Sequence, residues 1–430
     1  MIRYVKITNF GPIRDTVELN FEAVDQDGSP AYEVEMPDKQ RLLKLAYIYG
    51  ANASGKTTVL KAIEFIRRLW QNPYTNKDEE LDYSPFLFRS EPVQFPSSIE
   101  LSFYAGGIRY IYTVSFSITS IHSEKLLVYR TNQPTELFSR TTDLEKRLSQ
   151  IEFGNRVRGS AADLNSLTTA TLHNNSVLGA FQKTNADLPD FEELSKWNSS
   201  FFSSLVDAQT DLSDSTAYNI SVDPGFARWM DAYLNKADKN IRGVSVKSEL
   251  PKNFEAILKR INETSNSKID SEALKKRVQN LRISFIHELE GNEVYSLSLE
   301  QESSGSVRYF GLGHVMYQLL TQPHFAEIDE LDTSLHADLI KYFLEMFLLN
   351  SQQSQLLFTT HNVSLLADSD FIRRDALWFT EKGSNGEVSL YSAAEFDSDT
   401  LRKGASIVNA YKAGRLGGRP NLGSPYINAE

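Results

Sequence analysis

The first seventy residues change from an alternating apolar pattern to a helical one. Apolar positions alternate with polar ones in residues 2–10 and 17–21, which predicts two short strands around a turn at Gly11-Pro12. Residues 45–49 form a continuous apolar run, which is typical of a short buried strand. Residues 57–70 carry apolar side chains at helical spacing. This part therefore predicts the local order strand, glycine-containing loop, helix.

The next part of the chain predicts an antiparallel lobe followed by helices. Apolar residues alternate over 97–130 on both sides of a glycine turn, which indicates a β-lobe. From about residue 140 to 285, stretches rich in Ser, Asn and Asp separate helical candidates, and we interpret this part as a helical insertion. No heptad pattern persists there, so we do not expect a long coiled coil. The helical candidates in this insertion span residues 226–234, 254–262 and 271–281.

The C-terminal part returns to an alternation of strands and helices. The pattern predicts strands at 295–299, 325–328 and 355–360 and helices at 307–320 and 334–349. A short strand pair and an end rich in Gly and Arg follow. The chain is therefore predicted to have an α/β fold. We divide it into an N-terminal half (1–140), a helical insertion (141–283) that we expect to offer a partner surface, and a C-terminal half (284–430).

Composition excludes several classes of protein. The chain has 430 residues, 41% of them hydrophobic and 23% charged, which is ordinary for a globular protein. There is no cysteine, which excludes a disulfide framework, a cysteine nucleophile and a thiolate metal site. The N-terminus lacks the apolar core of a signal peptide, and the apolar runs are too short to span a bilayer. We therefore expect a cytoplasmic protein without a membrane partner.

Net charge bears on nucleic-acid binding. The formal net charge of −11 gives no bulk basic surface for DNA or RNA. A local basic patch remains open, because the sum does not describe the distribution of charge.

The loop after the strand at 45–49 carries the clearest chemistry. It matches the pattern G-x-x-x-x-G-K-[ST], in which backbone N–H groups and a helix N-terminus surround phosphate oxygens. Lys56 would neutralise the β- and γ-phosphates, and the Thr57 hydroxyl would ligate Mg²⁺. The spacing therefore predicts a site for ATP and Mg²⁺. Its binding residues are Gly50, Ala51, Asn52, Ala53, Ser54, Gly55, Lys56, Thr57 and Thr58.

Two acids follow the predicted strand at 325–328. Asp329 would hold the Mg²⁺ water shell, and Glu330 would polarise the attacking water. Glu327 interrupts a strand that is otherwise apolar. An alternative is a surface acid run in which Asp332 or Ser334 caps the following helix.

Two further elements carry candidate phosphate contacts. His361 follows the predicted strand at 355–360, where it can donate to the γ-phosphate and act in catalysis with Lys56 and Glu330. Ser304 and Gly305 open the predicted helix at 307–320, and their hydroxyl and the free helix N-terminus would form a second phosphate cradle. An ordinary serine N-cap explains the same residues equally well.

Together these residues resemble the ABC/SMC/RecF superfamily of ATPase heads. More narrowly they resemble bacterial AAA-family ATP-binding proteins of the abortive-infection or phage-defence type. The resemblance covers roughly 1–130 and 280–420 and rests on the phrases ITNFGPI, YIYGANASGKTTVLKAI, ESSGSVRYFGL, IDELDTSLH and LLFTTHNVSLL, with RRDALWFTEK and YKAGRLGG further on. It implies an ABC-type P-loop head with a mixed central sheet, an antiparallel β-lobe and a helical insertion.

The resemblance also implies roles for individual residues. Ser304 and Gly305 would contact the γ-phosphate held by a second subunit, and Asp332 would lie in the loop that crosses the dimer interface. A homodimer or a higher homo-oligomer is therefore expected. Gln94 lies in the region where such heads carry a Q-loop glutamine, without a firm alignment. The residues expected near adenine and the phosphates are Asn9, Phe10 and Arg14.

Three functions follow as hypotheses. The first is an ATPase that acts as a sensor or scaffold and controls a separate effector, a nuclease or toxin, in anti-phage defence. The alternative is a RecF-like repair or recombination ATPase acting directly on DNA. Its candidate basic positions are Lys275, Lys276, Arg277, Arg282, Arg373, Arg374, Lys412, Arg415 and Arg419.

The third hypothesis is a nuclease housed in the insertion or just after it. It is the weakest of the three, because the residues that could serve it lack metal-site spacing. Those residues are His173, Asp207, Asp211, Asp214 and His287.

Overall fold

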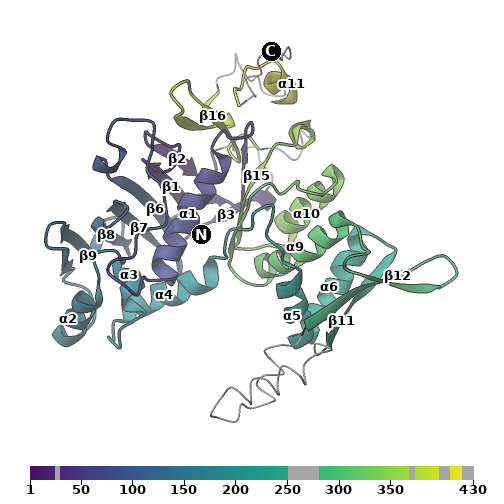
Figure 1. Ribbon diagram of the computed structural model, residues 1–430, viewed down its shortest axis with the longest axis horizontal. Coiled ribbons are helices and arrows are strands. Elements are labelled where there is room, and N and C mark those ends of the chain that lie inside the picture. The colour runs from purple at the N-terminus through teal and green to yellow at the C-terminus, as the bar shows by residue number, and fades with distance from the viewer. Residues whose placement is uncertain (25–29, 250–279, 368–372, 397–406, 419–430) are drawn as a thin grey trace, which may run out of the picture. The chain divides into compact units, whose positions relative to one another are not determined.

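The computed structural model describes residues 1–24, 30–249, 280–367, 373–396 and 407–418 (Figure 1). It divides into two compact units. The first unit contains Met1–Ala208, Leu319–Thr333 and Leu344–Glu430, and the second contains Gln209–Gln318 and Ser334–Phe343. The helical segment 254–262 predicted from the sequence lies outside the described residues, as do Lys275, Lys276, Arg277 and Arg419.

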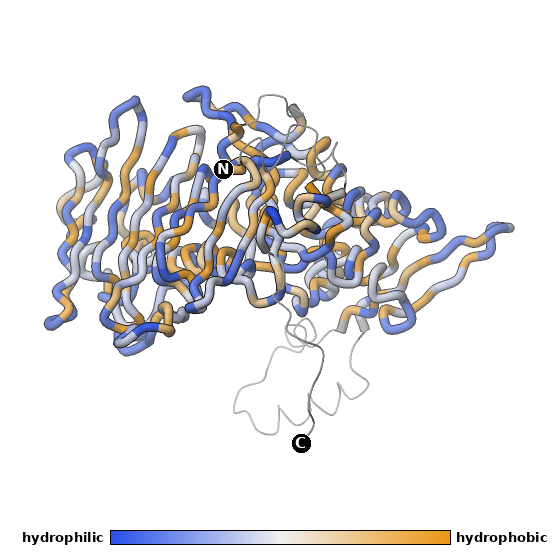
Figure 2. Tube along the Cα trace, turned by 90° about the horizontal axis from the view of Figure 1, so that it is seen from above, coloured by the Kyte–Doolittle hydropathy of each residue, from blue (hydrophilic) through white to orange (hydrophobic). Residues whose placement is uncertain are grey.

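The first unit contains a seven-stranded antiparallel sheet in the order β10-β9-β8-β7-β6-β1-β2. Apolar and polar residues alternate along these strands, as Figure 2 shows by the change of colour along the tube. One face of the sheet can therefore be buried while the other meets water. The strands are β1 (Ile2–Thr8), β2 (Val17–Asn20), β6 (Ser97–Ala105), β7 (Ile108–Phe116), β8 (Ile121–Tyr129), β9 (Thr135–Asp143) and β10 (Leu148–Phe153).

A five-stranded sheet in the order β14-β15-β5-β16-β17 forms the second layer of this unit. The first four strands are parallel, and β17 joins the edge antiparallel to β16. Parallel strands are buried on both faces, which explains their continuous apolar runs. The strands are β5 (Leu45–Tyr49), β14 (Phe325–Ile328), β15 (Gln355–Thr360), β16 (Leu377–Lys382) and β17 (Val388–Ser392).

Helix α1 (Lys56–Gln71) packs in the core that both sheets share. Its buried face includes Leu60, Ile63 and Ile66, and the same cluster contains Val5 of β1 and Ile48 of β5. The period of about 3.6 residues places these side chains on a continuous stripe. The helix therefore fixes the end of β5 relative to both sheets.

Shorter elements complete the first unit. The strands β3 (Glu33–Glu35) and β4 (Arg41–Leu43) pair antiparallel. The other elements are η1 (Pro30–Tyr32), η2 (Pro92–Gln94), α2 (Ala161–Ala170), α3 (Val177–Phe181), α4 (Pro189–Phe201), η3 (Val363–Ala367), η4 (Ala393–Glu395) and α11 (Ile407–Lys412).

The second unit combines helices with a three-stranded antiparallel sheet in the order β11-β12-β13. Its elements are α5 (Ser213–Val222), α6 (Pro224–Ala237), β11 (Ile241–Glu249), β12 (Asn280–Glu288) and β13 (Val294–Ser298), with most of α9 (Ser304–Thr321) and the start of α10 (Ala337–Asn350). Tyr233 of α6 stacks on Tyr309 of α9 with ring centroids 4.4 Å apart, which joins these two helices.

The segment 141–283, expected from the sequence to be a helical insertion, contains strands as well as helices. It contains helices α2 to α6, but β10 extends the antiparallel sheet and β11 pairs with β12. Its helices up to α4 place Leu167, Phe191 and Phe201 in the core of the first unit. The sequence pattern did not predict β10 and β11, because only one face of such a strand needs apolar residues and their open faces carry polar side chains.

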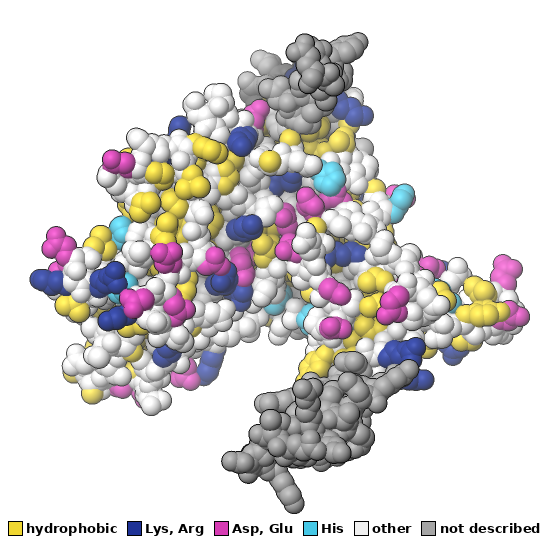
Figure 3. Space-filling view, in the orientation of Figure 1, with side chains coloured by type: hydrophobic (Ala, Val, Ile, Leu, Met, Phe, Trp, Pro, Cys, Tyr) yellow, Lys and Arg dark blue, Asp and Glu magenta, His cyan; other side chains and the backbone are white. Residues whose placement is uncertain are grey.

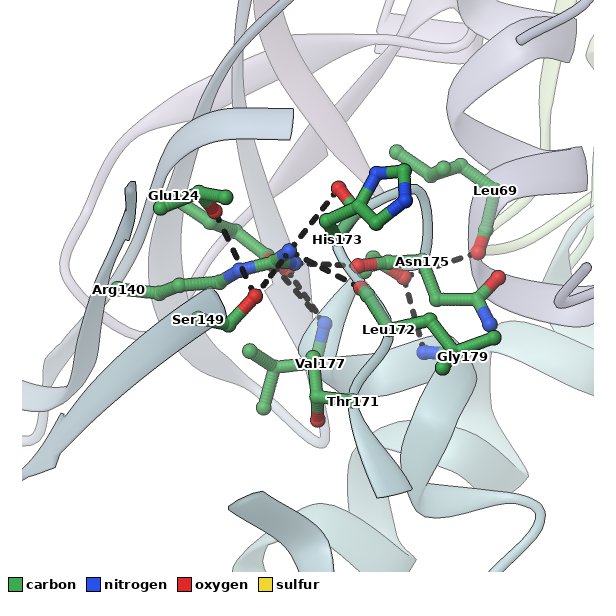
Figure 4. A network of polar contacts seen from close by, with 12 residues as sticks. Leu69, Glu124, Arg140, Ser149, Thr171, Leu172, His173, Asn175, Val177 and Gly179 are labelled. Atoms are coloured by element: carbon green, nitrogen blue, oxygen red, sulfur yellow. Dashed lines mark hydrogen bonds and ion pairs between the residues drawn. The ribbon is translucent and has the colours of Figure 1, made fainter. Parts of the chain in front are cut away.

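A buried polar network ties the segment after α2 to the β-lobe (Figure 4). Arg140 and Glu124 are both fully buried and lie 3.2 Å apart, and Arg140 also donates to the carbonyls of Leu172, His173 and Asn175. The Glu124 carboxylate accepts from the backbone N–H of Val177 at 3.0 Å. Burial raises the pKa of Glu124, and Arg140 and these hydrogen bonds act in the opposite direction.

Within the described residues, none of the helices combines the length and the apolar character needed to cross a bilayer.

Candidate functional site

Two glycines hold the loop between β5 and α1, where the sequence predicts phosphate binding. The five residues of β5 are all buried, and α1 begins at Lys56. Gly55 has φ +97°, which an L-residue rarely adopts, and a Cβ there would lie 2.7 Å from Val388. A Cβ on Gly50 would lie 2.5 Å from the hydroxyls of Ser54 and Thr380. Both glycines are therefore required by the backbone and its neighbours.

The other loop residues divide into exposed and buried positions. Asn52 and Ala53 are exposed at the tip of the loop, whereas the Ser54 hydroxyl is buried 2.6 Å from that of Thr380. Ala51 and Thr58 are half-buried on either side of the loop. The tip is therefore open to a ligand, and its base is held by β16.

Lys56 is buried inside the loop that it closes. Its Nζ donates to the carbonyls of Gly50 at 2.8 Å and Ala51 at 3.0 Å. Burial lowers the pKa of Lys56, while the carboxylates of Glu330 and Asp329 act in the opposite direction. The ammonium group is therefore held where the loop is concave, with acids nearby.

Asp329 joins the loop to the end of β14. Its Oδ2 accepts from the hydroxyl of Thr57 at 2.7 Å, and its Oδ1 accepts from the hydroxyl of Thr359 at 2.5 Å. Thr57 and Asp329 are separated by 272 positions in the sequence. The Thr57 hydroxyl and the Asp329 carboxylate nevertheless lie within hydrogen-bond distance of each other, and both are hard oxygen ligands of the kind that Mg²⁺ prefers. These two side chains therefore fit a magnesium ion.

Glu330 and His361 follow the ends of adjacent strands. The Glu330 backbone has φ +49°, and its N–H donates to the hydroxyl of Thr359 at 2.8 Å. His361 is half exposed, and its Nδ1 lies 3.3 Å from the Oδ2 of Asp332. The hydroxyl of Tyr49 donates to the carbonyl of His361 at 2.6 Å. The parallel pairing of β14 with β15 brings these residues to one edge.

Thr359 and Tyr49 are site residues that sequence reasoning missed. Thr359 contacts both acids, and Tyr49 fixes the backbone at His361. The signal for Thr359 was its polarity at the end of a buried strand, one residue before another threonine. Tyr49 gave no signal, because its apolar ring is ordinary in a buried strand.

Ser304 and Gly305 form the start of α9 in the second unit. The hydroxyl of Ser303 accepts from the backbone N–H of Ser306 at 3.0 Å, so a serine does cap this helix. A Cβ on Gly305 would lie 2.9 Å from the carbonyl of Ser334. A cavity of about 380 Å³ in the same unit is lined by Ser303, Gly305, Ser306, Ser334 and His336, among others.

Two of the three residues expected near adenine serve the core instead. The Asn9 side chain is buried and bonds to the backbone of Phe86 and Phe95. The Phe10 ring is buried against Phe65, with centroids 5.8 Å apart. Neither side chain is free for a base, because each completes the packing of the β1–β2 turn.

The third residue, Arg14, is partly exposed, and its guanidinium lies 2.8 Å from the carboxylate of Asp15. Gln94 lies exposed in η2.

Both histidines considered for a nuclease have polar partners in the structure. His173 is buried and its Nδ1 lies 3.1 Å from the hydroxyl of Ser120, while His287 lies 2.7 Å from Glu302. Among the described residues, no group of three or more His, Asp or Glu side chains is arranged to hold a metal ion. Arg373, a candidate for a basic patch, is buried against Asp375.

Comparison with known proteins identifies relatives by sequence and by structure. The model of the family described as "AAA domain, putative AbiEii toxin, Type IV TA system" matches residues 45–367. A comparison with curated proteins found no match.

Three similar solved structures are heads of SMC proteins. The SMC head domain from Thermotoga maritima is 13% identical, with a TM-score of 0.43 and coverage of 91% of this chain and 98% of that chain. An Smc head bound to the C-winged helix domain of ScpA is 13% identical, with a TM-score of 0.44 and coverage of 96% and 99%. An Smc head with an extended coiled coil, bound to the C-terminal domain of ScpA and derived from Pyrococcus furiosus, is 12% identical, with a TM-score of 0.39 and coverage of 96% and 98%.

Proposed function

Because the chain belongs to the family described as "AAA domain, putative AbiEii toxin, Type IV TA system", we propose that it hydrolyses ATP with Mg²⁺ at the loop of residues 50–57. The observation that carries the proposal is the 2.7 Å hydrogen bond between the Thr57 hydroxyl and Asp329. It joins the phosphate-binding loop to the acidic end of a neighbouring strand. Chance similarity to a glycine-rich loop would not produce this second contact.

The residues present fit both ATP and Mg²⁺. The loop, whose tip at Asn52 and Ala53 is exposed, offers backbone N–H groups and the N-terminus of α1 to the phosphates, and Lys56 supplies the positive charge. The Lys56 Nζ can exchange its hydrogen bonds to the carbonyls of Gly50 and Ala51 for hydrogen bonds to phosphate oxygens. Thr57 and Asp329 would hold Mg²⁺, which supplies positive charge to the β- and γ-phosphates when bound.

The acid after Asp329 is the proposed general base. Glu330 accepts a proton from water as the water oxygen bonds to the γ-phosphorus, and the bond from that phosphorus to the β–γ bridging oxygen breaks. The hydrogen bond from its backbone to Thr359 holds this residue in place. His361 would donate to the γ-phosphate, supported by Asp332 on its other ring nitrogen.

We extend the proposal to a dimer in which ATP is shared by two copies of the chain. Ser304 and Gly305 begin α9 in a different unit from the loop, and each copy would present this helix start to the nucleotide held by the other. Binding of ATP would then join the two heads, and hydrolysis would let them separate. Native mass spectrometry of the Glu330→Gln variant with ATP and Mg²⁺ tests this step: a doubled mass supports it, and a monomer that retains ATP contradicts it.

The biological role that we propose is control of a separate effector in anti-phage defence. The description of the family as a toxin of a TA system supports a role in defence. The test is the number of phage plaques on host cells that carry the chain with its neighbouring genes, compared with cells that carry Glu330→Gln. A chain that protects or kills cells by itself would show that no separate effector is needed.

Direct action on DNA has less support. On the face of the molecule in Figure 3, acidic and basic side chains are intermixed and no broad basic field is visible. Arg373, one of the candidate basic residues, is 4% exposed and bonded to Asp375 and Glu33. DNA affinity that falls steeply with salt concentration would restore this alternative.

The experiment for the ATPase itself compares phosphate release by the unmodified chain, Lys56→Ala and Glu330→Gln. Lys56→Ala should lose ATP binding, because the charge that holds the phosphates is removed. Glu330→Gln should bind ATP and release phosphate far more slowly. Retained ATP affinity in Lys56→Ala would contradict the assignment of the loop.

A further inference from the structure

The order of the strands determines the direction in which a bound nucleotide lies. The acids and His361 follow β14 and β15, which lie on one side of β5 in the five-stranded sheet. Under the proposed function, on which this inference rests, the γ-phosphate points to that side. The nucleoside must therefore leave the loop on the other side, towards β16 and β17.

Two segments border the loop on that side. Val388 at the start of β17 lies against Gly55, at 2.7 Å from the position of a Cβ there, and its backbone N–H donates to the carbonyl of Pro12 at 2.9 Å. A Cβ on Gly11 would lie 3.1 Å from the Thr58 side chain. The β1–β2 turn and the β16–β17 turn therefore form the wall next to the first turn of α1.

An exposed aromatic ring lies against this wall. Phe88 is 68% exposed, and its ring lies 2.7 Å from the position that a Cβ on Gly386 would take. The buried ring of Phe86 supports it edge-on, with centroids 5.8 Å apart at 82°. The Phe86 backbone N–H donates to Asn9 at 3.0 Å, which fastens this segment to the β1–β2 turn.

Covering an exposed phenylalanine ring contributes about 1.5–3 kcal/mol, so the exposed Phe88 ring offers a ligand a favourable contact. A purine base is flat, aromatic and of similar width, and bases stack readily on aromatic side chains. Lys382, the last residue of β16, places its ammonium group 5.9 Å from the centroid of the Phe88 ring. We propose that Phe88 is the stacking platform for the purine base of the bound nucleoside triphosphate.

The test separates the base from the phosphates. Affinities for ATP and for inorganic tripolyphosphate, each with Mg²⁺, are measured by calorimetry on the unmodified chain, Phe88→Ala and Phe88→Trp. Phe88→Ala should weaken ATP about tenfold, within the range that loss of one stacked base gives, and leave tripolyphosphate unchanged. Phe88→Trp should keep ATP affinity, and its added fluorescence should change with ATP and not with tripolyphosphate.

A neighbouring residue provides the matched control. Leu87 is 61% exposed on the same segment, so Leu87→Ala removes a similar exposed apolar side chain and should leave ATP affinity unchanged. Unchanged ATP affinity in Phe88→Ala would overturn the inference, and so would an equal loss of tripolyphosphate affinity. Neither result would contradict the proposed ATPase function, provided that Lys56→Ala loses affinity for both ATP and tripolyphosphate. Failure of the unmodified chain to bind either ligand would instead overturn the proposed function and this inference with it.

Discussion

Two buried polar clusters in the first unit differ in how completely their charges are paired. In the β-lobe, both oxygens of Glu124 accept hydrogen bonds, and its partner Arg140 donates to a carboxylate, a hydroxyl and three backbone carbonyls. Glu327 lies in β14, two residues before Asp329, and is also fully buried. Neither of its carboxylate oxygens has a hydrogen-bond partner among the described residues. Burial raises the pKa of Glu327 well above its usual range, with Glu64 acting in the same direction.

The difference separates a cluster with a structural role from one next to the ligand site that we propose. Both carboxylate oxygens of Glu124 are paired, and the one buried atom of Arg140 without a partner among the described residues is its Nε. This pairing fits a structural link between the β-lobe and the segment 171–177. The end of β14 carries Asp329, whose partners are the side chains of Thr57 and Thr359 and whose proposed ligand is a metal ion. A buried polar residue such as Glu327 can be retained because it lies next to a functional site, even where it lowers the stability of the fold.

The largest expected effect comes from breaking the Glu124–Arg140 cluster. Glu124→Ala leaves Arg140 buried without its carboxylate, and we expect the free energy of unfolding to fall by about 3–5 kcal/mol. Chemical denaturation measures this change. Glu136→Ala is the control, because its 2.8 Å pair with Lys125 is partly exposed and should contribute less than about 1 kcal/mol. Similar losses in both variants would show that burial of the pair does not matter.

The next effect concerns the proposed ligand site and should change rate without changing stability. Glu330→Gln is expected to slow phosphate release by about 100-fold or more, because a general base contributes on that scale. The melting temperature should stay close to that of the unmodified chain, since Glu330 is not part of the buried core. Turnover near the unmodified rate would move the base to another residue.

Replacing glutamate by leucine should change the free energy of unfolding in opposite directions at two buried sites. Glu327→Leu removes a buried carboxyl that has no hydrogen-bond partner in the described part of the chain, and it is expected to stabilise the fold by about 1–3 kcal/mol. Glu124→Leu should destabilise it, because Arg140 loses its partner. Denaturant midpoints of both variants check the pair of signs. Destabilisation by Glu327→Leu would mean that this carboxyl has a stabilising role that its surroundings do not explain.

The smallest expected effect tests the support of His361. Tyr49→Phe removes the 2.6 Å hydrogen bond to the carbonyl of His361 and should cost about 0.5–1.5 kcal/mol of stability. Tyr47→Phe on the same strand is the control, because the buried Tyr47 hydroxyl has no hydrogen-bond partner among the described residues. That variant should be neutral or slightly stabilising. Equal destabilisation by both would remove Tyr49 from the support of the site.

Much of the fold could be predicted because the pattern of apolar residues is strong where strands are buried. The strands at 45–49, 325–328 and 355–360 have the bounds expected from the sequence, and their apolar runs reflect burial on both faces. The prediction was weaker over 141–283, where β10 and β11 have an open polar face. In that segment the same residues suit a strand edge or a linker, and only pairing with β9 or β12 decides between them.

The sequence by itself determined the prediction of a phosphate-binding loop, since its glycines, lysine and threonine act through local backbone geometry. It also determined that acids follow one strand and a histidine the next. Only the tertiary structure decided that the Thr57 hydroxyl meets Asp329, that Thr359 contacts both acids, and that Asn9 and Phe10 belong to the core. These contacts depend on which strands are neighbours in the sheet, and strand order is set by packing between residues far apart in the chain.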